Sequence, residues 1–204
     1  AVGDLNNDGY PDLYLSNFGP DRLYLNNRDG TFVDVTAAAG IDNSAWTTSV
    51  ALVDFDRDGW LDLYASAYFA GVEDVATEHL GQPHAGEVPR LYRNNRDGTF
   101  TDVAAAMGLD RIQYVMGSNY GDLDNDGLPD FYVGTGDPDY RQLMPNRMFR
   151  NTGRRFEEVT GSGGFGTLDK GHGVSFADMD HDGDQDVHKV LGGANEGDLS
   201  ANVL

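Results

Sequence analysis

A nine-residue acidic loop recurs four times in this sequence. Its copies read DLNNDGYPD from Asp4, DFDRDGWLD from Asp54, DLDNDGLPD from Asp122 and DMDHDGDQD from Asp178. The first, third, fifth and ninth positions carry Asp, except for Asn6 in the first copy, and the sixth position is always Gly. Carboxylates at alternate positions of a short loop converge, and each close pair repels by about 4 kcal/mol at a separation of about 4 Å. The pattern therefore predicts a cation in every loop.

The donor atoms of these loops are hard oxygens, which favour calcium, magnesium or manganese over zinc or copper. Several carboxylates and a main-chain carbonyl from the seventh position suit the flexible shell of calcium better than the octahedron of magnesium. The glycine lets the backbone turn so that the two ends of the loop meet. The sequence thus predicts four calcium ions, one per loop. The predicted ligands are Asp4, Asn6, Asp8, Tyr10 and Asp12; Asp54, Asp56, Asp58, Trp60 and Asp62; Asp122, Asp124, Asp126, Leu128 and Asp130; and Asp178, Asp180, Asp182, Asp184 and Asp186, with the seventh residue contributing its carbonyl.

An EF-hand is the alternative that these loops must be weighed against. It requires a bidentate Glu at the twelfth loop position and a helix on each side. Here the twelfth residues are Leu15, Ala65, Val133 and Lys189, none of which can chelate as that Glu does. The segments that follow, such as LYLSN and FYVGTG, are short aromatic and β-branched runs that are typical of strands. We therefore expect each loop to lead directly into a strand.

A second motif recurs between the loops. RLYLNNRDGTFVDV at 22–35 matches RLYRNNRDGTFTDV at 90–103, and RMFRNTGRRFEEV at 147–159 is a shorter version. Each indicates a β-hairpin, because two alternating strands flank a turn with Asp-Gly or Thr-Gly. One repeat then reads as an inner strand (48–53), the acidic loop, a second strand (61–68) and the hairpin. Repetition of four antiparallel strands predicts an all-β propeller with one calcium loop per blade.

Short links of small residues join one repeat to the next. They read TAAAG at 36–40 and AAAMG at 104–108. We expect at most one helical turn in each, which Gly40 and Gly108 end.

Composition narrows the class of partner. The chain has 204 residues, a net charge of −20, 27 glycines and no cysteine. The negative charge argues against nucleic acid and anionic membranes as partners. No apolar run is long enough to span a membrane. No signal peptide is visible, but the chain opens within a repeat and does not begin with Met, so we expect a missing N-terminal segment.

These motifs resemble the FG-GAP or VCBS repeats of the integrin α-subunit type, and more closely bacterial proteins similar to cartilage acidic protein. In those proteins the propeller precedes an ASPIC/UnbV domain, and residues 171–204 resemble the last repeat before it. The resemblance implies a calcium-bound propeller of about seven blades in a secreted or cell-surface protein that binds or adheres. The sequence departs from that pattern at Asn6 and in the insertion 69–89, which lacks the cysteines such proteins often carry.

The whole chain, 1–204, is predicted to be one propeller region. Its repeats span about 1–45, 46–110, 111–166 and 167–204, and the last is incomplete. Four repeats do not make seven blades. Three explanations stay open: a longer native protein, closure as a small propeller, or pairing with other copies of the chain.

The repeated aromatic residues, the arginines, the histidines and the insertion can each be interpreted in two ways. The equivalent aromatic residues are predicted to pack between blades rather than to stack on carbohydrate. The arginines that open each hairpin are predicted to form ion pairs between blades rather than a phosphate site, and the five histidines show no spacing typical of a metal site. The insertion is either a binding segment or a mobile loop. The aromatic positions are Tyr14, Tyr64, Tyr132, Phe32, Phe100 and Phe156, and the arginines are Arg22, Arg90 and Arg147.

The predicted function is a non-enzymatic, extracellular calcium-binding repeat protein that serves as an adhesive or structural binding module. Its partner is a protein or glycan at the cell surface, or copies of itself. A self-assembling surface filament is the first alternative. A calcium-dependent polysaccharide lyase or a glycan-binding propeller is the second. No cysteine nucleophile, G-x-S-x-G or H-E-x-x-H motif supports an enzyme.

Overall fold

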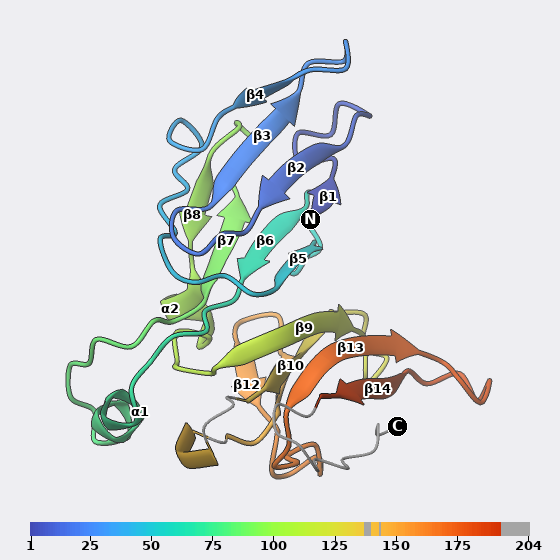
Figure 1. The fold of residues 1–204 in the computed structure, drawn as a ribbon. Coiled ribbons are helices and arrows are strands. Elements are labelled where there is room, and N and C mark those ends of the chain that lie inside the picture. Colours follow the sequence, from blue (N-terminus) through green and yellow to red (C-terminus); the bar gives the residue numbers. More distant parts are fainter. Residues whose placement is uncertain (137–139, 143, 193–204) are drawn as a thin grey trace.

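A computed structural model of the chain describes residues 1–136, 140–142 and 144–192. Its strands form four antiparallel sheets, in which strands that are adjacent in sequence are also hydrogen-bonded neighbours (Figure 1). The first three sheets have four strands each, and the fourth has two in the described part of the chain. The strands are β1 (Val2–Gly3), β2 (Asp12–Leu15), β3 (Arg22–Asn26) and β4 (Phe32–Asp34); β5 (Val50–Val53), β6 (Asp62–Ala65), β7 (Arg90–Asn94) and β8 (Phe100–Asp102); β9 (Val115–Gly121), β10 (Asp130–Thr135), β11 (Arg147–Asn151) and β12 (Phe156–Glu158); and β13 (Gly171–Ala177) and β14 (Asp186–Leu191).

Each of the first three sheets is a propeller blade that starts with an inner strand and ends with the outer hairpin, as the repeat pattern predicted, and the fourth shows the inner strand and the second strand. The inner strand and the second strand of the second blade are shorter than the predicted 48–53 and 61–68. Register repeats from blade to blade. Tyr14 pairs with Leu23, Tyr64 with Leu91, and Tyr132 with Met148. Residues 193–204, which the sequence assigned to the last repeat, lie outside the described residues.

The hydrophobic core lies between blades rather than within one sheet. Phe156 of the third blade packs in one cluster with Phe55 of the second, and their ring centroids are 6.2 Å apart. Phe100 of the second blade packs in the same way in a cluster with Tyr14 of the first. Burial of such large side chains supplies most of the stabilisation that holds neighbouring blades together.

The prediction of packing between blades is wrong for one of the six aromatic positions. Phe32 is 40% exposed, whereas its equivalents Phe100 and Phe156 are buried. An outer-strand phenylalanine is covered by the preceding blade, and in the described part of the chain no blade precedes the first. The tyrosines at the second-strand position are all buried.

Helices occur only in the connections of the described residues. The expected turn at 104–108 is α2 (Ala104–Met107), which ends at Gly108 with a φ of 76°. The insertion contains α1 (Val72–His79), which the sequence did not predict. The Asp74 carboxylate caps this helix, because it accepts hydrogen bonds from the main-chain N–H groups of Gly71 at 2.8 Å and Ala85 at 3.0 Å. A 3₁₀ turn, η1, covers Tyr140–Gln142.

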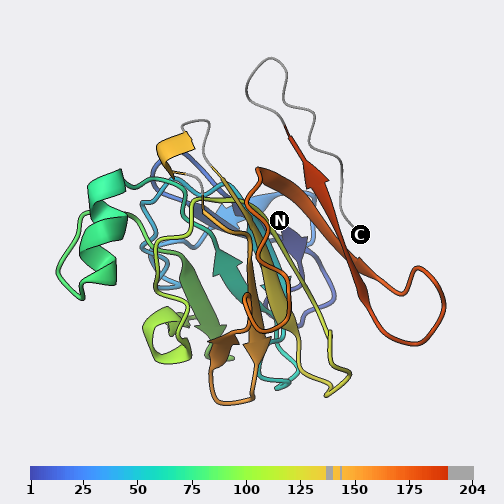
Figure 2. The ribbon, with the colours of Figure 1, turned by 90° about the horizontal axis from the view of Figure 1, so that it is seen from below.

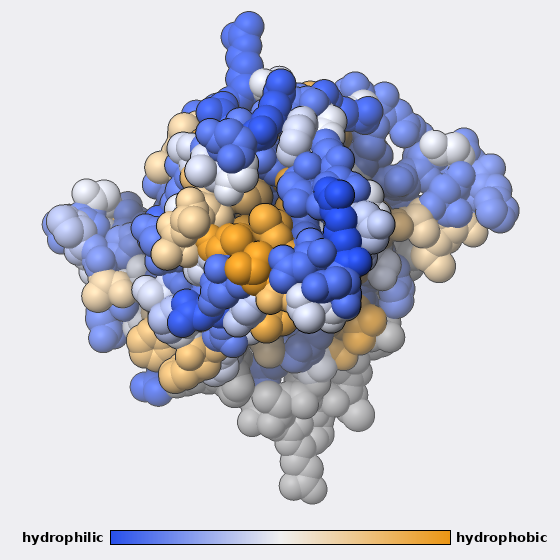
Figure 3. Space-filling model, turned by 90° about the horizontal axis from the view of Figure 1, so that it is seen from above, coloured by the Kyte–Doolittle hydropathy of each residue, from blue (hydrophilic) through white to orange (hydrophobic). Residues whose placement is uncertain are grey.

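The insertion and the last described blade lie at opposite sides of the molecule. Seen from below, α1 projects on one side and the β13–β14 hairpin on the other (Figure 2). The face seen from above is largely hydrophilic around one compact apolar patch (Figure 3). No helix in the described residues is long and apolar enough to cross a membrane.

Candidate metal centres

The four acidic loops share one internal hydrogen-bond pattern. In the first loop, the N–H of Gly9 donates to Oδ2 of Asp4 at 2.7 Å, and the N–H of Tyr10 donates to Oδ1 of Asp8 at 2.9 Å. The same two bonds recur in the other three loops. The sixth-position glycines have φ values from 86° to 98°, a region that costs other residues strain. The loops therefore hold their first and fifth carboxylates in a fixed arrangement.

The ninth-position aspartate joins the loop to the outer hairpin. Oδ2 of Asp62 accepts the N–H of Phe55 at 3.2 Å, and Oδ1 accepts the N–H of Asn94 at 2.8 Å. Asp12 and Asp130 make the equivalent bonds. Burial raises the pKa of Asp62 to about 7, despite these two donors. This aspartate has a structural role, which the sequence did not reveal, in addition to its predicted role as a ligand.

Three of the four loops bring carboxylates together at one point. In each, three carboxylates can each place an oxygen so that all lie within 4.8 Å of one another. The third loop carries a further indication, because Oδ1 of Asp122 is buried and has no hydrogen-bond partner. An uncompensated buried carboxylate oxygen is costly unless a cation or a donor reaches it. The converging sets are Asp54, Asp56 and Asp58; Asp122, Asp124 and Asp130; and Asp178, Asp180 and Asp186.

The first loop differs because Asn6 stands at its third position. The Nδ2 of Asn6 donates to Oδ2 of Asp8 at 3.2 Å. The amide thus faces the carboxylate with its nitrogen, and its oxygen accepts the N–H of Asp8 at 3.1 Å. The oxygen remains a neutral donor for a cation, so we expect this loop to attract a cation less strongly than the others.

Arginines of the outer hairpins partly neutralise the loops; Arg28 and Arg96 lie in the hairpin turns and Arg150 lies in β11. Nη2 of Arg28 lies 2.9 Å from Asp8, Nη2 of Arg96 lies 2.6 Å from Asp58, and Nε of Arg150 lies 2.5 Å from Asp124. The hydrogen bond from Arg28 holds the pKa of Asp8 below its usual range. The sequence analysis missed these three residues. The repeated Asn-Asn-Arg-Asp-Gly turn was a usable signal for Arg28 and Arg96.

The arginines at the start of each hairpin do not pair between blades, so that prediction is wrong. Nη1 of Arg90 contacts Asp102 of its own hairpin at 2.7 Å. The pairs Arg22 with Asp34 and Arg147 with Glu158 are also internal to a hairpin, at 3.8 Å and 3.9 Å. The geometry follows from the hairpin register, which places the first residue of one strand beside the end of the other.

Neighbouring loops are also connected to each other. Nδ2 of Asn7 donates to the carbonyl of Gly59 in the second loop at 3.0 Å. Nδ2 of Asn125 donates to the Gly183 carbonyl at 3.3 Å and to Asp184 at 2.6 Å in the fourth loop. The fourth loop position has a φ near 60° in all four copies, which Asn tolerates better than most residues. The first loop is thus bonded to the second, and the third loop to the fourth.

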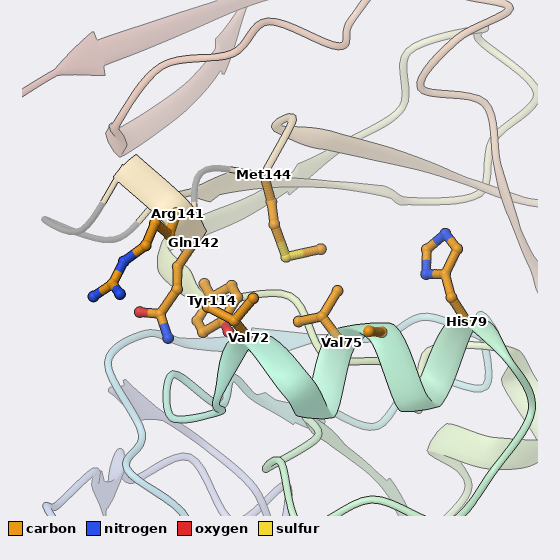
Figure 4. A pocket seen from close by; sticks show the side chains of 8 residues that line it. Val72, Val75, His79, Tyr114, Arg141, Gln142 and Met144 are labelled. Carbon is orange, nitrogen blue, oxygen red and sulfur yellow. The ribbon is translucent and has the colours of Figure 1, made fainter.

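A separate cavity lies beside α1. Its volume is about 350 Å³, and Figure 4 shows Val72 and Val75 on α1 facing Met144 across it. His79 is at one end of the helix, and no lining residue in the described part of the chain carries a carboxylate.

Comparison with known families matches residues 4–65, 75–133 and 122–188 to the FG-GAP-like repeat, and residues 46–88 to the FG-GAP repeat. The chain belongs to the FG-GAP-like repeat family. The three longer matches each contain at least one complete acidic loop, so the matched segments include the candidate metal centres. This result confirms the resemblance to FG-GAP repeats.

Individual relatives of this FG-GAP repeat protein extend the comparison. Cartilage acidic protein 1 of Xenopus tropicalis is 32% identical over 203 residues, which is 94% of this chain and 28% of that protein. The human protein of the same name is 42% identical over 65 residues, 31% of this chain and 10% of that protein. The chain therefore spans less than a third of these relatives' length. A solved structure of an Agrocybe aegerita lectin that recognises non-reducing terminal N-acetylglucosamine has a TM-score of 0.48 and 19% identity, covering 93% of this chain and 46% of the lectin chain.

Proposed function

We propose that this FG-GAP repeat protein is a non-enzymatic, extracellular binding module whose acidic loops bind calcium. The observation that carries the proposal is the convergence of three carboxylates in each of three loops, within 4.8 Å, together with the unpartnered buried oxygen of Asp122. Only hard oxygen donors are present in these sets, which suits calcium better than zinc or copper.

Charge supports the same conclusion. The chain carries 34 acidic and 14 basic side chains, and the hairpin arginines contact only one or two carboxylates per loop. Salt bridges of this exposed type contribute little to stability, because solvent screens them. They cannot offset the mutual repulsion of three or four carboxylates in one loop. A divalent ion in each loop removes this repulsion and two formal charges at once.

The position of the loops explains what the ions contribute to the fold. Each loop joins an inner strand to the next strand, and its ninth aspartate holds the outer hairpin through main-chain N–H groups. Asn7 and Asn125 connect neighbouring loops. A bound calcium ion therefore stiffens three elements of one blade and the seam to the next. Loops that are mainly exposed suit the weaker calcium affinities of extracellular modules, about 0.1–1 mM.

The class of partner is inferred from the charge of the protein surface. The net charge of −20 disfavours nucleic acid and anionic lipid. We therefore propose a protein or glycan ligand outside the cell, presented to a rigid calcium-bound propeller surface. Cartilage acidic protein 1 of Xenopus tropicalis is similar over 94% of this chain, and its name supports the proposal of an extracellular role.

Isothermal titration of the full chain with calcium tests the proposal. We expect saturable binding at the acidic loops and weaker binding of magnesium. Asp124→Ala should remove one site, whereas Asp110→Ala, which changes an exposed aspartate outside the loops, should leave the stoichiometry unchanged. Equal stoichiometry in both variants would refute the assignment of the third loop. Light scattering of the calcium-loaded protein separates this proposal from the filament alternative, which requires growth to large particles.

A further inference from the structure

A cluster of exposed aromatic residues lies away from the acidic loops. We call it the aromatic corner, and it consists of Phe18, Trp46, Tyr68 and Phe69. Phe18 is 83% exposed, Phe69 61% and Trp46 36%. The rings of Phe18 and Trp46 are nearly perpendicular, at 81°, with centroids 5.2 Å apart, and Trp46 and Tyr68 are 4.8 Å apart at 69°. Contiguous exposed aromatic surface of this kind is typical of binding sites.

Hydrogen bonds hold the corner in place. Phe18 and Trp46 form a β-bridge, and the N–H of Tyr68 donates to the Trp46 carbonyl at 3.1 Å. Oε2 of Glu87 accepts the N–H of Trp46 at 2.9 Å and that of Phe69 at 3.3 Å. Segments more than 40 residues apart in sequence are thus tied together around one carboxylate. A preorganised site loses less entropy when a ligand binds.

The corner lies on a surface that the stacking of blades does not cover. Its residues come from the β2–β3 turn, the β4–β5 link and the segment after β6, which are grouped at one end of the first two sheets (Figure 1). The acidic loops precede β2 and β6 and so lie at the opposite end of the same strands. Blades pack through sheet faces, whereas the corner is at strand ends. Packing against another blade therefore does not explain its exposure.

The cavity at the corner selects a class of ligand. It has a volume of about 410 Å³ and is lined by Phe18, Gly19, Ser44, Trp46, Phe69 and Glu87. Its walls are mainly apolar, its one charged lining group is the Glu87 carboxylate, and no basic residue lines it. A saccharide needs several polar groups to fix its hydroxyls, and here only one hydroxyl and one carboxylate side chain are available. Aromatic faces beside a carboxylate attract a weakly hydrated organic cation.

We propose that the aromatic corner binds the trimethylammonium group of a choline-type small molecule. The cation lies against the rings of Phe18, Trp46 and Phe69, and Glu87 balances its charge. The net charge of −20 attracts cations to the protein surface. This inference deepens the proposed binding function, and it rests on that proposal only for the view that the chain binds ligands. The site itself does not involve calcium.

Titration of the calcium-loaded full chain with choline chloride, followed by NMR at the tryptophan indole N–H groups, tests this site. The chain has two tryptophans, so Trp60 in the second loop is an internal control. We expect a saturable shift of the Trp46 signal at choline concentrations of about 1–10 mM, and no shift of the Trp60 signal. The neutral isostere 3,3-dimethylbutan-1-ol should bind at least about tenfold more weakly, because it lacks the charge.

Variants separate the site from non-specific effects. Glu87→Gln keeps an oxygen that can accept the two N–H bonds, and we expect it to weaken choline binding about tenfold. Phe69→Ala should weaken it similarly, whereas Phe32→Ala, which removes an exposed ring elsewhere, should have no effect. Vesicles with phosphocholine headgroups should bind no more tightly, per headgroup, than free choline.

Three results would overturn the inference. They are the absence of a saturable shift at Trp46 up to about 100 mM choline, equal binding of the neutral isostere, and tighter binding of methyl glucoside than of choline. A chain that binds calcium but not choline would refute this inference and leave the proposed function intact. A chain that binds choline but whose fold does not depend on calcium would refute the proposed calcium-binding function and leave this inference intact.

Discussion

Asn94 in the outer hairpin of the second blade donates a hydrogen bond from Nδ2 to the main-chain carbonyl of Leu5, 2.8 Å away in the acidic loop of the first blade. Asn151 of the third blade makes the same bond to Phe55 in the second loop, also at 2.8 Å. The first and second acidic loops are therefore each held both by their own blade and by the next one. The candidate metal centres are part of the seam between blades.

Replacement of Asn94 measures how much the hydrogen bond between blades contributes to stability. Asn94→Ala loses the bond to Leu5 and leaves a carbonyl without a partner, which costs about 1–3 kcal/mol when buried. Asn26→Ala is the matched control, because Asn26 makes the equivalent bonds within its own blade, to Pro11 and Arg28, but none to another blade. We expect urea unfolding to show that Asn94→Ala lowers the free energy of unfolding by about 1–2 kcal/mol more than Asn26→Ala does. Equal losses in the two variants would contradict the role of the seam.

The fold was predictable from the sequence because the same order of strands and loops recurs in several repeats. Four loops and three hairpins agree in order along the chain. The spacing predicted that carboxylates gather in the loops, but which three converge differs between loops of the same spacing, since Asp58 takes part in the second loop and Asp130 in the third. Gly40 and Gly108 also ended the links where expected, at φ values of 77° and 76°.

Three features could not be predicted because they depend on contacts outside the repeat pattern: helix α1, the exposure of Phe32 and the arginine–carboxylate pairs. The insertion occurs only once, so no second copy of its sequence supports the prediction of α1. The carboxylate of Asp74 that caps the helix also accepts a hydrogen bond from Ala85, which lies outside the helix. Phe32 matches Phe100 in sequence, but burial depends on the preceding blade. The pairing of Arg28 and Arg96 with loop carboxylates crosses 20 and 38 residues, a distance at which charge pairing cannot be deduced from one sequence.

Burial between blades predicts unequal effects at equivalent aromatic positions. Phe156 lies in the core cluster and its ring centroid is 5.2 Å from that of Phe131. Phe156→Ala should therefore cost about 3–5 kcal/mol in free energy of unfolding. Phe32→Ala should cost less than about 1 kcal/mol, because the side chain is already 40% exposed. Chemical denaturation of the two variants provides the comparison, and similar losses would show that the interface between blades does not dominate stability.

Arg96 should compete with a cation in the second loop. Its Nη2 atom is 2.6 Å from Asp58, and the arginine side chain is 54% exposed. We expect Arg96→Gln to lower stability only slightly in EGTA, because the exposed ion pair that offsets repulsion in the loop is largely screened by solvent. The same change should raise calcium affinity several-fold, since one fixed positive charge is removed. Arg111→Gln, outside the loops, is the control, and calorimetry that finds weaker calcium binding in Arg96→Gln would contradict this view.

The cap of α1 predicts acid sensitivity of the insertion. Hydrogen bonds from the main-chain N–H groups of Gly71 and Ala85 hold the pKa of Asp74 below its usual range. A carboxyl group with a depressed folded-state pKa stabilises the fold above its unfolded pKa, and this stabilisation is lost as pH falls through the folded pKa. The protection factors of the α1 amides should therefore fall as pH drops below the usual carboxyl pKa of about 4 and Asp74 becomes protonated, and Asp74→Ala should remove this fall. A persistent pH response in the variant would assign the effect to another group.

Thermal unfolding of the full chain in excess calcium and in excess EGTA tests the central claim most directly. A site at one hundred times its Kd stabilises the folded state by about 2.7 kcal/mol, so several loops together should shift the melting temperature by more than about 10 °C. We predict this loss on chelation, and its recovery when calcium is restored. An identical melting temperature in the two conditions would show that the acidic loops hold the blades without calcium, and would contradict the proposed function.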